Sequence, residues 1–335
     1  MTKPLAPGSR IGILGGGQLG RMLAVAASRL GFGCHIYDPD PMAPAAQVAA
    51  KHTCAPYEDI AALRAFAQGV DVITFEFENI PTAALDLLEA SGTAIFPDRR
   101  ALATSQDRLT EKAFLRDIGL ATAPYSAVDT AADLRDAMDN IGAQGILKTR
   151  RFGYDGKGQQ RLSAPTEIDE AIAGLAGAPA IFEGLVNFST EISVVVARAL
   201  GGQVSAFDPG ENLHEGGILR RTTVPAAVPS SLITDAVLLA GKIVSELAYV
   251  GVMGVELFVT PQGLLVNEVA PRVHNSGHWT QQGCAVDQFE QHMRAVAGLP
   301  LGDGSRFADV EMQNLIGDDI ATLPALFAEG ASVHL

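Results

Sequence analysis

Cysteine is scarce in this sequence, and no hydrophobic run is long enough to cross a membrane. The three cysteines, Cys34, Cys54 and Cys284, are far apart and lack the CxxC spacing of zinc and redox sites. An odd number of cysteines without such pairs is typical of a reducing compartment and disfavours a disulfide scaffold. The first residues also lack the apolar core of a signal peptide. We therefore expect a cytoplasmic protein with no membrane partner.

An excess of positive charge is absent too. The chain has 335 residues, and 38 Asp and Glu against 24 Lys and Arg give it a net charge of −14. This balance disfavours nucleic acid as a partner, because binding to its backbone needs a surplus of Lys and Arg. Single cations can still hold the phosphates of a nucleotide. The length indicates two or three domains, and the 47% of hydrophobic residues can give each a core.

Apolar runs of strand length alternate with helical patterns in the first third of the chain. We predict a helix over 18–30 and strands at 10–14, 34–38, 70–75 and 93–96. Strands that alternate with helices favour a parallel, doubly wound sheet. The alternation therefore predicts an α/β domain at the N-terminus.

A glycine-rich turn follows the first predicted strand. Gly15, Gly17 and Gly20 form the GxGxxG pattern of dinucleotide-binding loops, and Asp38 ends the next strand, where an acidic residue can bind a ribose. The N-terminus of the following helix would attract an anion. The pattern is common and leaves three alternatives open. These are an NAD-dependent oxidoreductase, a loop that only packs within a Rossmann-like scaffold, and a site for another phosphate-bearing ligand.

Residues 148–159 are more specific. Lys148 ends a predicted strand, and the loop after it combines glycines at 153, 156 and 158 with cations at 150, 151 and 157. The backbone N–H groups of such a loop can surround phosphates while Lys148 supplies a point charge. The GxxxxGK[ST] spacing of a Walker A loop is not present. The alternative is a solvated hairpin turn.

A β-hairpin is predicted around a Pro-Gln-Gly sequence at 261–263. Two apolar, β-branched runs flank this sequence, which we expect to form a three-residue turn. If Thr260 faces Leu264 across the turn, the register places Glu256 directly opposite Glu268. Carboxylates in directly opposed positions repel each other.

A cation between the two glutamates would remove this repulsion. Mg²⁺ typically uses one or two carboxylates together with substrate phosphates. Asn267 and Arg272 stand beside the pair and add an amide and a fork of donors suited to phosphate. The hairpin therefore predicts a metal site, and the alternative is two solvated glutamates on its polar face.

Two further segments carry polar groups next to predicted strands. The apolar linker after Glu183 could present backbone groups to an adenine edge, and Glu191 could accept hydrogen bonds from ribose hydroxyls, although the segment could also be an ordinary connection. His274 and His278 are four residues apart, a spacing that binds zinc on a helix. Gly277 between them favours a loop, and we expect this loop to recognise substrate.

Taken together, these segments resemble the ATP-grasp superfamily and, within it, the N5-carboxyaminoimidazole ribonucleotide synthetases of purine biosynthesis. The resemblance covers nearly the whole chain. Its signatures are GGGQLGRM at 15–22, FEFENIP at 75–81, DRLTEK at 107–112, RFGYDGKGQ at 151–159, NLHEGGILR at 212–220 and NEVAPRVHNSGHWT at 267–280.

The resemblance implies an α/β fold that is α+β in its ATP-grasp part. A Rossmann-like parallel sheet over 1–106 would precede an ATP-grasp domain over 107–300, with a lid subdomain over about 121–186. A small C-terminal segment over 301–335 would follow. Relatives continue past a Val-His-Leu-like segment into basic runs that bind the substrate phosphate, so we expect this segment to be truncated at Leu335.

The resemblance also implies the reaction and its ligands. It would join 5-aminoimidazole ribonucleotide to bicarbonate, through carboxyphosphate, as ATP becomes ADP and phosphate, and the enzyme would be a homodimer. Mg²⁺ or Mn²⁺ would be held by Glu256 and Glu268. Ala270 stands where many ATP-grasp enzymes have an Asn ligand, so no third side-chain ligand is expected. The loop at 15–20 would face the ribonucleotide and bind no NAD.

The residues for each ligand follow by position in the quoted motifs. ATP would be bound by Arg108, Lys148, Gly153, Tyr154, Asp155, Gly156, Lys157, Gly158, Gln159, Glu183, Gly184, Leu185, Val186, Glu191, His214, Asn267 and Glu268. The ribonucleotide would be bound by Gln18, Glu76, Tyr154, Arg272, His274 and Asn275. Arg272, Lys148 and Asp155 would act in catalysis, with Arg272 on the transferring phosphoryl group.

Three other functions stay open beside this one. A ligase of the same superfamily could join a different acyl phosphate to a ribonucleotide amine, as a formate-using transformylase does. An NAD-dependent oxidoreductase would rest on the glycine loop and Asp38 alone. A non-catalytic nucleotide-binding module would fit the absence of the basic runs after Leu335.

Overall fold

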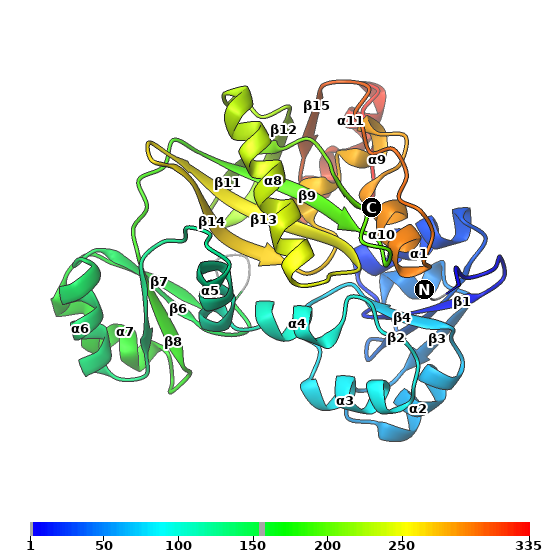
Figure 1. Cartoon of the computed structure of the whole chain (residues 1–335), viewed down its shortest axis with the longest axis horizontal. Coiled ribbons are helices and arrows are strands. Elements are labelled where there is room, and N and C mark those ends of the chain that lie inside the picture. The colour runs from blue at the N-terminus through cyan, green and yellow to red at the C-terminus, as the bar shows by residue number, and fades with distance from the viewer. Residues whose placement is uncertain (1–2, 154–157) are drawn as a thin grey trace.

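The chain is described by a computed structural model, which covers residues 3–153 and 158–335. A Rossmann-like domain lies at one end, a small subdomain lies at the other end, and a large antiparallel sheet lies between them (Figure 1). Within the described ranges, every helix is too short or too polar to cross a membrane.

The N-terminal domain is a parallel sheet with the strand order β3-β2-β1-β4. Its strands are β1 (Arg10–Leu14), β2 (Gly33–Asp38), β3 (Lys51–Cys54) and β4 (Val72–Phe75). Its helices are α1 (Gln18–Arg29), α2 (Ile60–Gln68), α3 (Thr82–Ala90) and α4 (Arg99–Ser105), with a 3-10 turn, η1 (Pro44–Gln47). Successive β1 residues face opposite sides, so Ile13 packs in the core with α1 and Leu14 in the core with α2 and α3.

One strand prediction in this domain is wrong, and one strand was not predicted. Residues 93–96 contribute only an isolated parallel bridge between Ile73 and Ile95, next to β4. The strand that was not predicted is β3, at the opposite edge of the sheet, whose residues are exposed or half-buried and include Lys51 and His52. An edge strand needs no continuous apolar run, so the apolar pattern that marks β1 and β2 does not mark β3.

The small subdomain is an antiparallel sheet with the order β5-β8-β6-β7. Its elements are β5 (Tyr125–Val128), α6 (Ala131–Ile141), β6 (Gly145–Thr149), β7 (Gln159–Leu162), η2 (Pro165–Glu167), α7 (Ile168–Gly174) and β8 (Ala180–Gly184). Thr130 and Asp133 form a capping box that starts α6. Its own core joins side chains of both helices to Leu147 and Phe182, so the subdomain packs as a separate unit.

The large sheet is antiparallel, with the order β14-β13-β9-β11-β12-β15 and with β10 paired to β9. Its strands are β9 (Thr190–Arg198), β10 (Val204–Ala206), β11 (Gly210–Glu215), β12 (Ile218–Val224), β13 (Gly251–Thr260), β14 (Gly263–Ala270) and β15 (Val310–Gln313). The helices around it are α5 (Arg108–Asp117), α8 (Ser230–Glu246), η3 (Asn275–Gly277), α9 (Thr280–Gly283) and α10 (Gln288–Val296).

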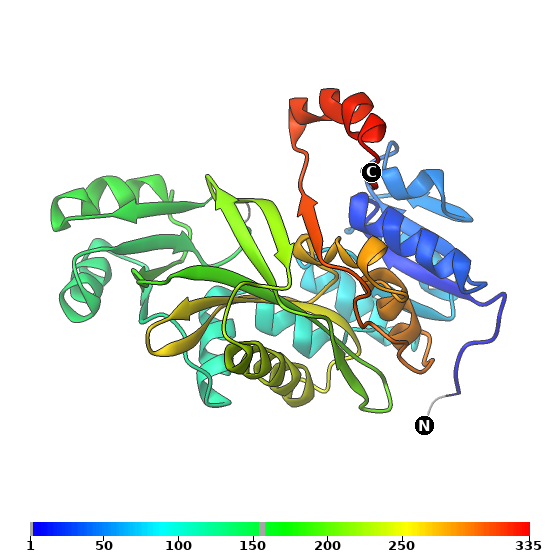
Figure 2. The ribbon, with the colours of Figure 1, turned by 90° about the horizontal axis from the view of Figure 1, so that it is seen from above.

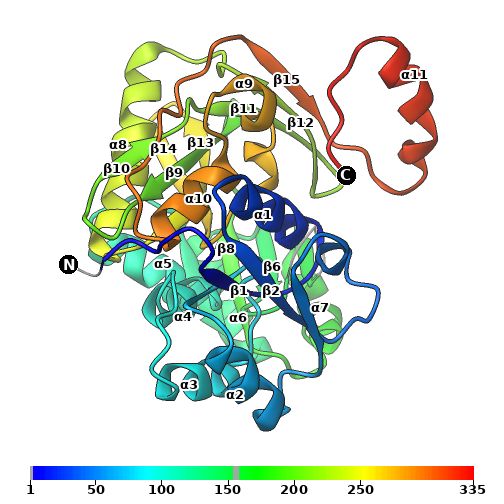
Figure 3. The same ribbon diagram turned by 90° about the vertical axis from the view of Figure 1, so that its right-hand side faces the viewer.

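The central strand β9 of this sheet is buried on both faces. Val194 and Val196 of β9 pack in the core with α8, whereas Val195 and Ala197 pack in the core with α10. Helix α1 of the N-terminal domain lies beside α10 and contributes to the same core (Figure 3). The N-terminal domain and the large sheet therefore share one core, which fixes the cleft between them.

The segment after residue 300 adds to the edge of the large sheet. Strand β15 pairs with β12, and the backbones of Cys284 and Arg306 form an isolated antiparallel β-bridge. The last elements, η4 (Gly317–Thr322) and α11 (Leu323–Ala328), project away from the sheet (Figure 2). Part of the predicted C-terminal segment is thus continuous with the large sheet through β15.

His292 of α10 links the two larger domains inside the protein. Its Nε2 lies 2.8 Å from Thr74 Oγ1 on β4, and its Nδ1 accepts a hydrogen bond from the Val252 N–H on β13 at 3.1 Å. The ring is fully buried, so it is neutral with its proton on Nε2. Burial lowers the pKa of His292 to about 3.

We predict that His292 makes the fold sensitive to mild acid. His292 takes up a proton near pH 6.5 in the unfolded chain but only near pH 3 in the folded chain. The neutral His292 therefore contributes fully to the free energy of unfolding above pH 6.5. Below that pH, its contribution falls by up to about 1.4 kcal/mol per pH unit. Urea unfolding at pH 7.5, 6.5 and 5.5 should show a shallower decline for His292→Gln.

The control for this experiment is Thr74→Val. It removes the hydroxyl partner of His292 without changing the number of titrating groups, so its stability should be lower at every pH with an unchanged slope. Equal slopes for the wild type and His292→Gln would contradict the prediction.

Candidate active site

A cavity of about 460 Å³ lies where the N-terminal domain, the small subdomain and the large sheet meet. It is lined by many of the residues predicted from the sequence, namely Gln18, Glu76, Arg108, Gly153, His214, Glu256, Glu268, Arg272, His274 and Asn275. The cavity therefore brings residues from distant parts of the chain to one place.

The remaining predicted residues fall into two groups. Those that the structure describes but that do not line this cavity are Lys148, Gly158, Gln159, Glu183, Gly184, Leu185, Val186, Glu191 and Asn267. Of these, Lys148, Glu183, Glu191 and Asn267 contact lining residues or one another, as described below. Tyr154, Asp155, Gly156 and Lys157 lie outside the described residues.

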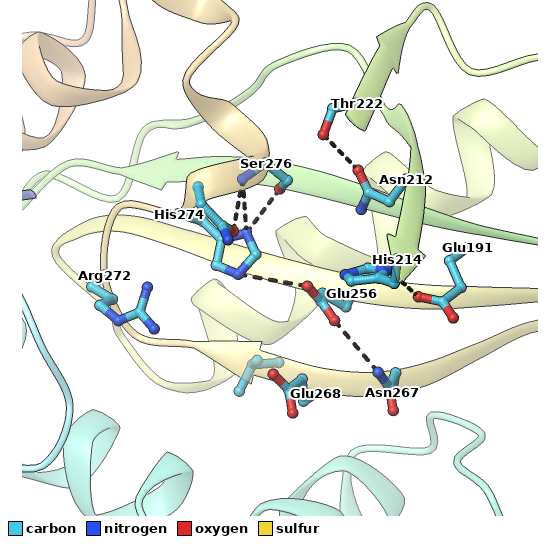
Figure 4. Close-up of polar contacts among 12 residues, drawn as sticks. Glu191, Asn212, His214, Thr222, Glu256, Asn267, Glu268, Arg272, His274 and Ser276 are labelled. Carbon is cyan, nitrogen blue, oxygen red and sulfur yellow. Dashed lines mark hydrogen bonds and ion pairs between the residues drawn. The ribbon is translucent and has the colours of Figure 1, made fainter. Parts of the chain in front are cut away.

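The hairpin places Glu256 of β13 opposite Glu268 of β14, as the sequence predicts. The turn is one residue shorter than expected, because Thr260 pairs with Gly263. A bulge on β14 restores the register: Leu257 pairs with Val266, and Asn267 is the extra residue. The side chain of Asn267 donates to Glu256 Oε2 at 3.4 Å (Figure 4).

The two glutamates differ in their electrostatic environment. Burial raises the pKa of Glu256, and the negative charge of Glu268 raises it further. Burial would also raise the pKa of Glu268, but the Arg108 guanidinium, whose Nη1 lies 2.9 Å from Glu268 Oε2, outweighs it and lowers that pKa. The surroundings thus favour the charged form of Glu268 and disfavour the charged form of Glu256.

This pair fits a hard divalent cation that shares its ligands with a substrate. In the described ranges no cluster of three or more His, Cys, Asp or Glu side chains could hold a metal. Two opposed carboxylates can supply part of the ligand set of Mg²⁺, which is usually bound together with phosphate oxygens of a nucleotide.

Two buried lysines converge on Glu183 of β8. Lys148 Nζ lies 3.0 Å from Glu183 Oε2, and Lys112 Nζ lies 3.3 Å from Glu183 Oε1. Lys112 also donates to the Asn267 carbonyl at 3.2 Å, so it joins the small subdomain to the glutamate hairpin. One carboxylate between two ammonium groups leaves a net positive charge, which suits a phosphate chain.

The sequence analysis assigned no role to Lys112, although it quoted the motif that contains it. Lys112 lies four residues after Arg108 on α5, so the two cations share a helix face. That spacing is the sequence signal that could have identified it.

His214 of β11 and Glu191 of β9 form a pair on the floor of the large sheet. His214 Nδ1 lies 2.8 Å from Glu191 Oε2 (Figure 4). Burial would lower the pKa of His214, but Glu191 outweighs it and raises that pKa. The pair presents a donor and an acceptor next to the glutamate hairpin, a combination that a ribose can use.

The glycine loop of the N-terminal domain is bound to carboxylates of the chain itself. Glu76 accepts hydrogen bonds from the N–H groups of Gly17 and, at 2.5 Å, of Gly20, and Asp38 accepts from the Gly16 N–H at 2.7 Å. A Cβ atom at Gly17 would lie 2.8 Å from Glu76 Oε1. These donors are the ones that a dinucleotide pyrophosphate would need, which argues against an NAD site.

Arg272 follows β14 and is paired with Glu78, a residue that the sequence analysis did not single out as a site residue. Its Nε lies 2.5 Å from Glu78 Oε2, and its Nη2 donates to Glu78 Oε1 at 3.3 Å. Burial would lower the pKa of Arg272, but Glu78 outweighs it and raises that pKa. The pair spans the cleft between the N-terminal domain and the large sheet.

His274 stands between Arg272 and Glu256 as a neutral ring. Its Nδ1 lies 2.8 Å from Ser276 Oγ, and its Nε2 lies 3.6 Å from Glu256 Oε1 (Figure 4). Burial and the charge of Arg272 lower the pKa of His274 to about 3. Residues 275–277 form a 3-10 turn, so His274 and His278 do not share the face of an α-helix.

Comparisons with known families agree with this architecture. Residues 9–106 match the ribonucleotide synthetase preATP-grasp domain, and residues 113–289 match the ATP-grasp domain. The fold and the site thus define an ATP-dependent ligase of the ATP-grasp class.

Similar proteins narrow this class. The N5-carboxyaminoimidazole ribonucleotide synthase of Brucella melitensis is 52% identical over 99% of this chain and 92% of its own length. A solved ADP complex of an N5-carboxyaminoimidazole ribonucleotide synthetase has a TM-score of 0.94 at 40% identity, covering 98% of this chain and 87% of the other.

A further solved structure holds a ribonucleotide. It is the N5-carboxyaminoimidazole synthase of Aspergillus clavatus in complex with ADP and 5-aminoimidazole ribonucleotide, with a TM-score of 0.88 at 31% identity over 97% of this chain and 86% of that one. The chain belongs to the N5-carboxyaminoimidazole ribonucleotide synthase family.

We predict that Glu268→Gln lowers turnover by about 100-fold or more. The amide keeps the shape of the side chain and can still accept from Arg108, but it removes the negative charge that would hold a metal. The thermal midpoint should therefore stay close to that of the wild type. ADP release at saturating ATP and thermal unfolding measure the two effects.

Glu246→Gln is a matched control, since this exposed side chain lies at the end of α8. It should leave turnover unchanged. A Glu268→Gln protein with a near-normal rate would show that the metal assignment is wrong.

Proposed function

We propose that the chain carboxylates the amine of 5-aminoimidazole ribonucleotide, with ATP and bicarbonate, to give N5-carboxyaminoimidazole ribonucleotide, ADP and phosphate. The observation that carries this proposal is the composition of the cavity. The large-sheet side of the cavity has the glutamate pair, its surrounding cations and Arg272, and the N-terminal side has the Glu76 and Glu78 loop, which Glu78 joins to Arg272. Nucleotide and ribonucleotide would thus meet between the two domains.

The nucleotide would lie along the large sheet and the small subdomain. The Glu191–His214 pair would bind the ribose, and the positive charge around Lys148 would hold the phosphates. We place the adenine at residues 183–186, where Leu185 is 37% exposed. Gly153, Gly158 and Gln159 belong to the predicted glycine-rich loop, and we propose them as contacts of the phosphates.

A divalent cation, Mg²⁺ or Mn²⁺, would be held by Glu256 and Glu268 and would neutralise the phosphate charge as it develops. The two carboxylates would orient the γ-phosphate through the ion. Arg108 now neutralises Glu268, and it would turn to the phosphates when the ion takes over this carboxylate.

The reaction needs two displacements. A bicarbonate oxygen attacks the γ-phosphorus as the bond to ADP breaks, which gives carboxyphosphate. The ribonucleotide amine then attacks the carboxyl carbon as the bond to phosphate breaks, and the proton of the amine leaves with the phosphate. Arg272 would stabilise the phosphoryl and carboxyl charge in both steps, and the closed cleft would exclude water.

The ribonucleotide would lie on the side of the N-terminal domain. Gln18, Glu76, Arg272, His274 and Asn275 line this part of the cavity, and we propose them as its contacts. The neutral His274 would donate one hydrogen bond without adding charge next to the glutamates. We further expect a cytoplasmic homodimer, in keeping with the three free cysteines.

We predict that ADP release requires a divalent cation, 5-aminoimidazole ribonucleotide and bicarbonate together. Formate should not replace bicarbonate, because carboxyphosphate forms from bicarbonate alone. A coupled assay for ADP in CO₂-depleted buffer, with bicarbonate or formate added back, measures this dependence.

Two outcomes would contradict the proposal. Equal product formation with formate would favour a formate-using ligase of the same superfamily. Quenching of NADH fluorescence at micromolar protein would revive the dinucleotide alternative.

A further inference from the structure

Three successive residues at the junction between the N-terminal and ATP-grasp domains hold the start of the glycine-rich loop. The Asp107 carboxylate lies 2.8 Å from the Arg150 guanidinium, and the Arg108 N–H donates to the Arg150 carbonyl at 3.0 Å. Arg108 Nη2 donates to the Gly153 carbonyl at 3.1 Å. Gln106 completes the set, and it is the only one of the three whose role does not follow from the nucleotide site or from helix capping.

Gln106 is buried and has a partner for each polar group of its amide. Its Nε2 donates to the carbonyls of Glu78 at 2.6 Å and Ile80 at 2.9 Å, and its Oε1 accepts from Arg151 Nη2 at 2.7 Å. A flipped amide would place its NH₂ against the guanidinium and its oxygen against two carbonyls. The contacts therefore fix the orientation of the amide.

The loop that Gln106 holds carries the groups of the ribonucleotide side. Glu76 binds the N–H groups of Gly17 and Gly20, and Glu78 binds Arg272 through two hydrogen bonds. A shift of this loop would displace the Glu76 carboxylate and would also release the guanidinium of Arg272. Both side chains line the cavity.

A continuous chain of hydrogen bonds thus crosses the cleft. It runs from Arg151 on the nucleotide side to the amide of Gln106, then to the carbonyl of Glu78, and from the Glu78 side chain to Arg272. Arg151 itself is exposed, so its contact with Gln106 is not a by-product of core packing. Each link has its donor and its acceptor satisfied, which gives such a network a single arrangement.

We propose that Gln106 is a positioning residue that holds the ribonucleotide-binding loop at residues 76–80 in register with the start of the glycine-rich loop. This inference rests on the proposed function and adds a residue to it. Gln106 lines the cavity, but both polar groups of its amide are bonded to the chain, so it would act through Glu76, Glu78 and Arg272. Turnover would then require that the loop at residues 76–80 and the start of the glycine-rich loop keep their relative positions.

Substitution of Arg151 tests this chain of hydrogen bonds, because Arg151 is at one end of it and Arg272, a proposed contact of the ribonucleotide, is at the other end. Arg151→Met removes the partner of Gln106 Oε1, so that only the two backbone carbonyls still hold the amide. We expect KM for 5-aminoimidazole ribonucleotide to rise about fivefold for Arg151→Met and about tenfold for Gln106→Met. The double variant should match Gln106→Met, since the same link is already broken.

Gln106→Glu distinguishes the contact of the amide oxygen with Arg151 from the contacts of the amide nitrogen with the two backbone carbonyls. A carboxylate accepts from Arg151 at least as well, but it cannot donate to the two backbone carbonyls. Its KM for the ribonucleotide should rise as in Gln106→Met. Arg161→Met, at an exposed site on β7 of the same subdomain, is the control for loss of a positive charge and should leave KM unchanged.

Steady-state ADP release and calorimetric binding of the ribonucleotide give the same comparison with and without turnover. An unchanged KM in Arg151→Met, or a double variant whose effect is the product of the two single effects, would overturn the inference alone. A wild type without ribonucleotide-dependent ADP release would overturn the proposed function and this inference with it.

Discussion

Two carboxylates held face to face across one hairpin set the conditions for the rest of the site. Glu256 and Glu268 repel each other, and cationic side chains lie around them. Arg108 neutralises Glu268, and Lys112 on the next turn of the same helix reaches the backbone of the hairpin. Through these contacts α5 is tied to the bulge of β14, and Lys112 ties it also to Glu183 of the small subdomain.

The sequence predicted the pairing of these glutamates for a reason that was partly wrong. The expected three-residue turn is a two-residue turn, and that change alone would have moved Glu268 out of register. The extra residue of the bulge compensates for it, and Asn267 then lies on the side of Glu256. A bulge depends on local backbone geometry, which the pattern of apolar residues does not show. The pairing of Glu256 with Glu268 could therefore be predicted, but the shorter turn and the bulge that together produce it could not.

Apolar patterns predicted the buried strands of the N-terminal domain, whereas the ATP-grasp part followed from the resemblance to a family. The buried strands β1 and β2 are continuous apolar runs, whereas β3 is a polar edge strand and left no such pattern. The residues that the sequence analysis missed, such as Glu78 and Lys112, act through partners more than 70 positions away. A single sequence names the side chains in such contacts but does not say which of them meet.

The carboxylate of Glu76 occupies the helix N-terminus where related loops in other folds receive a phosphate. A phosphate leaves with its product, but this anion is part of the chain. The glycine loop therefore keeps its partner through every catalytic cycle, and the entropy of ordering it is lost once, when the protein folds. A motif best known for exchangeable ligands serves here as permanent scaffolding for a neighbouring loop.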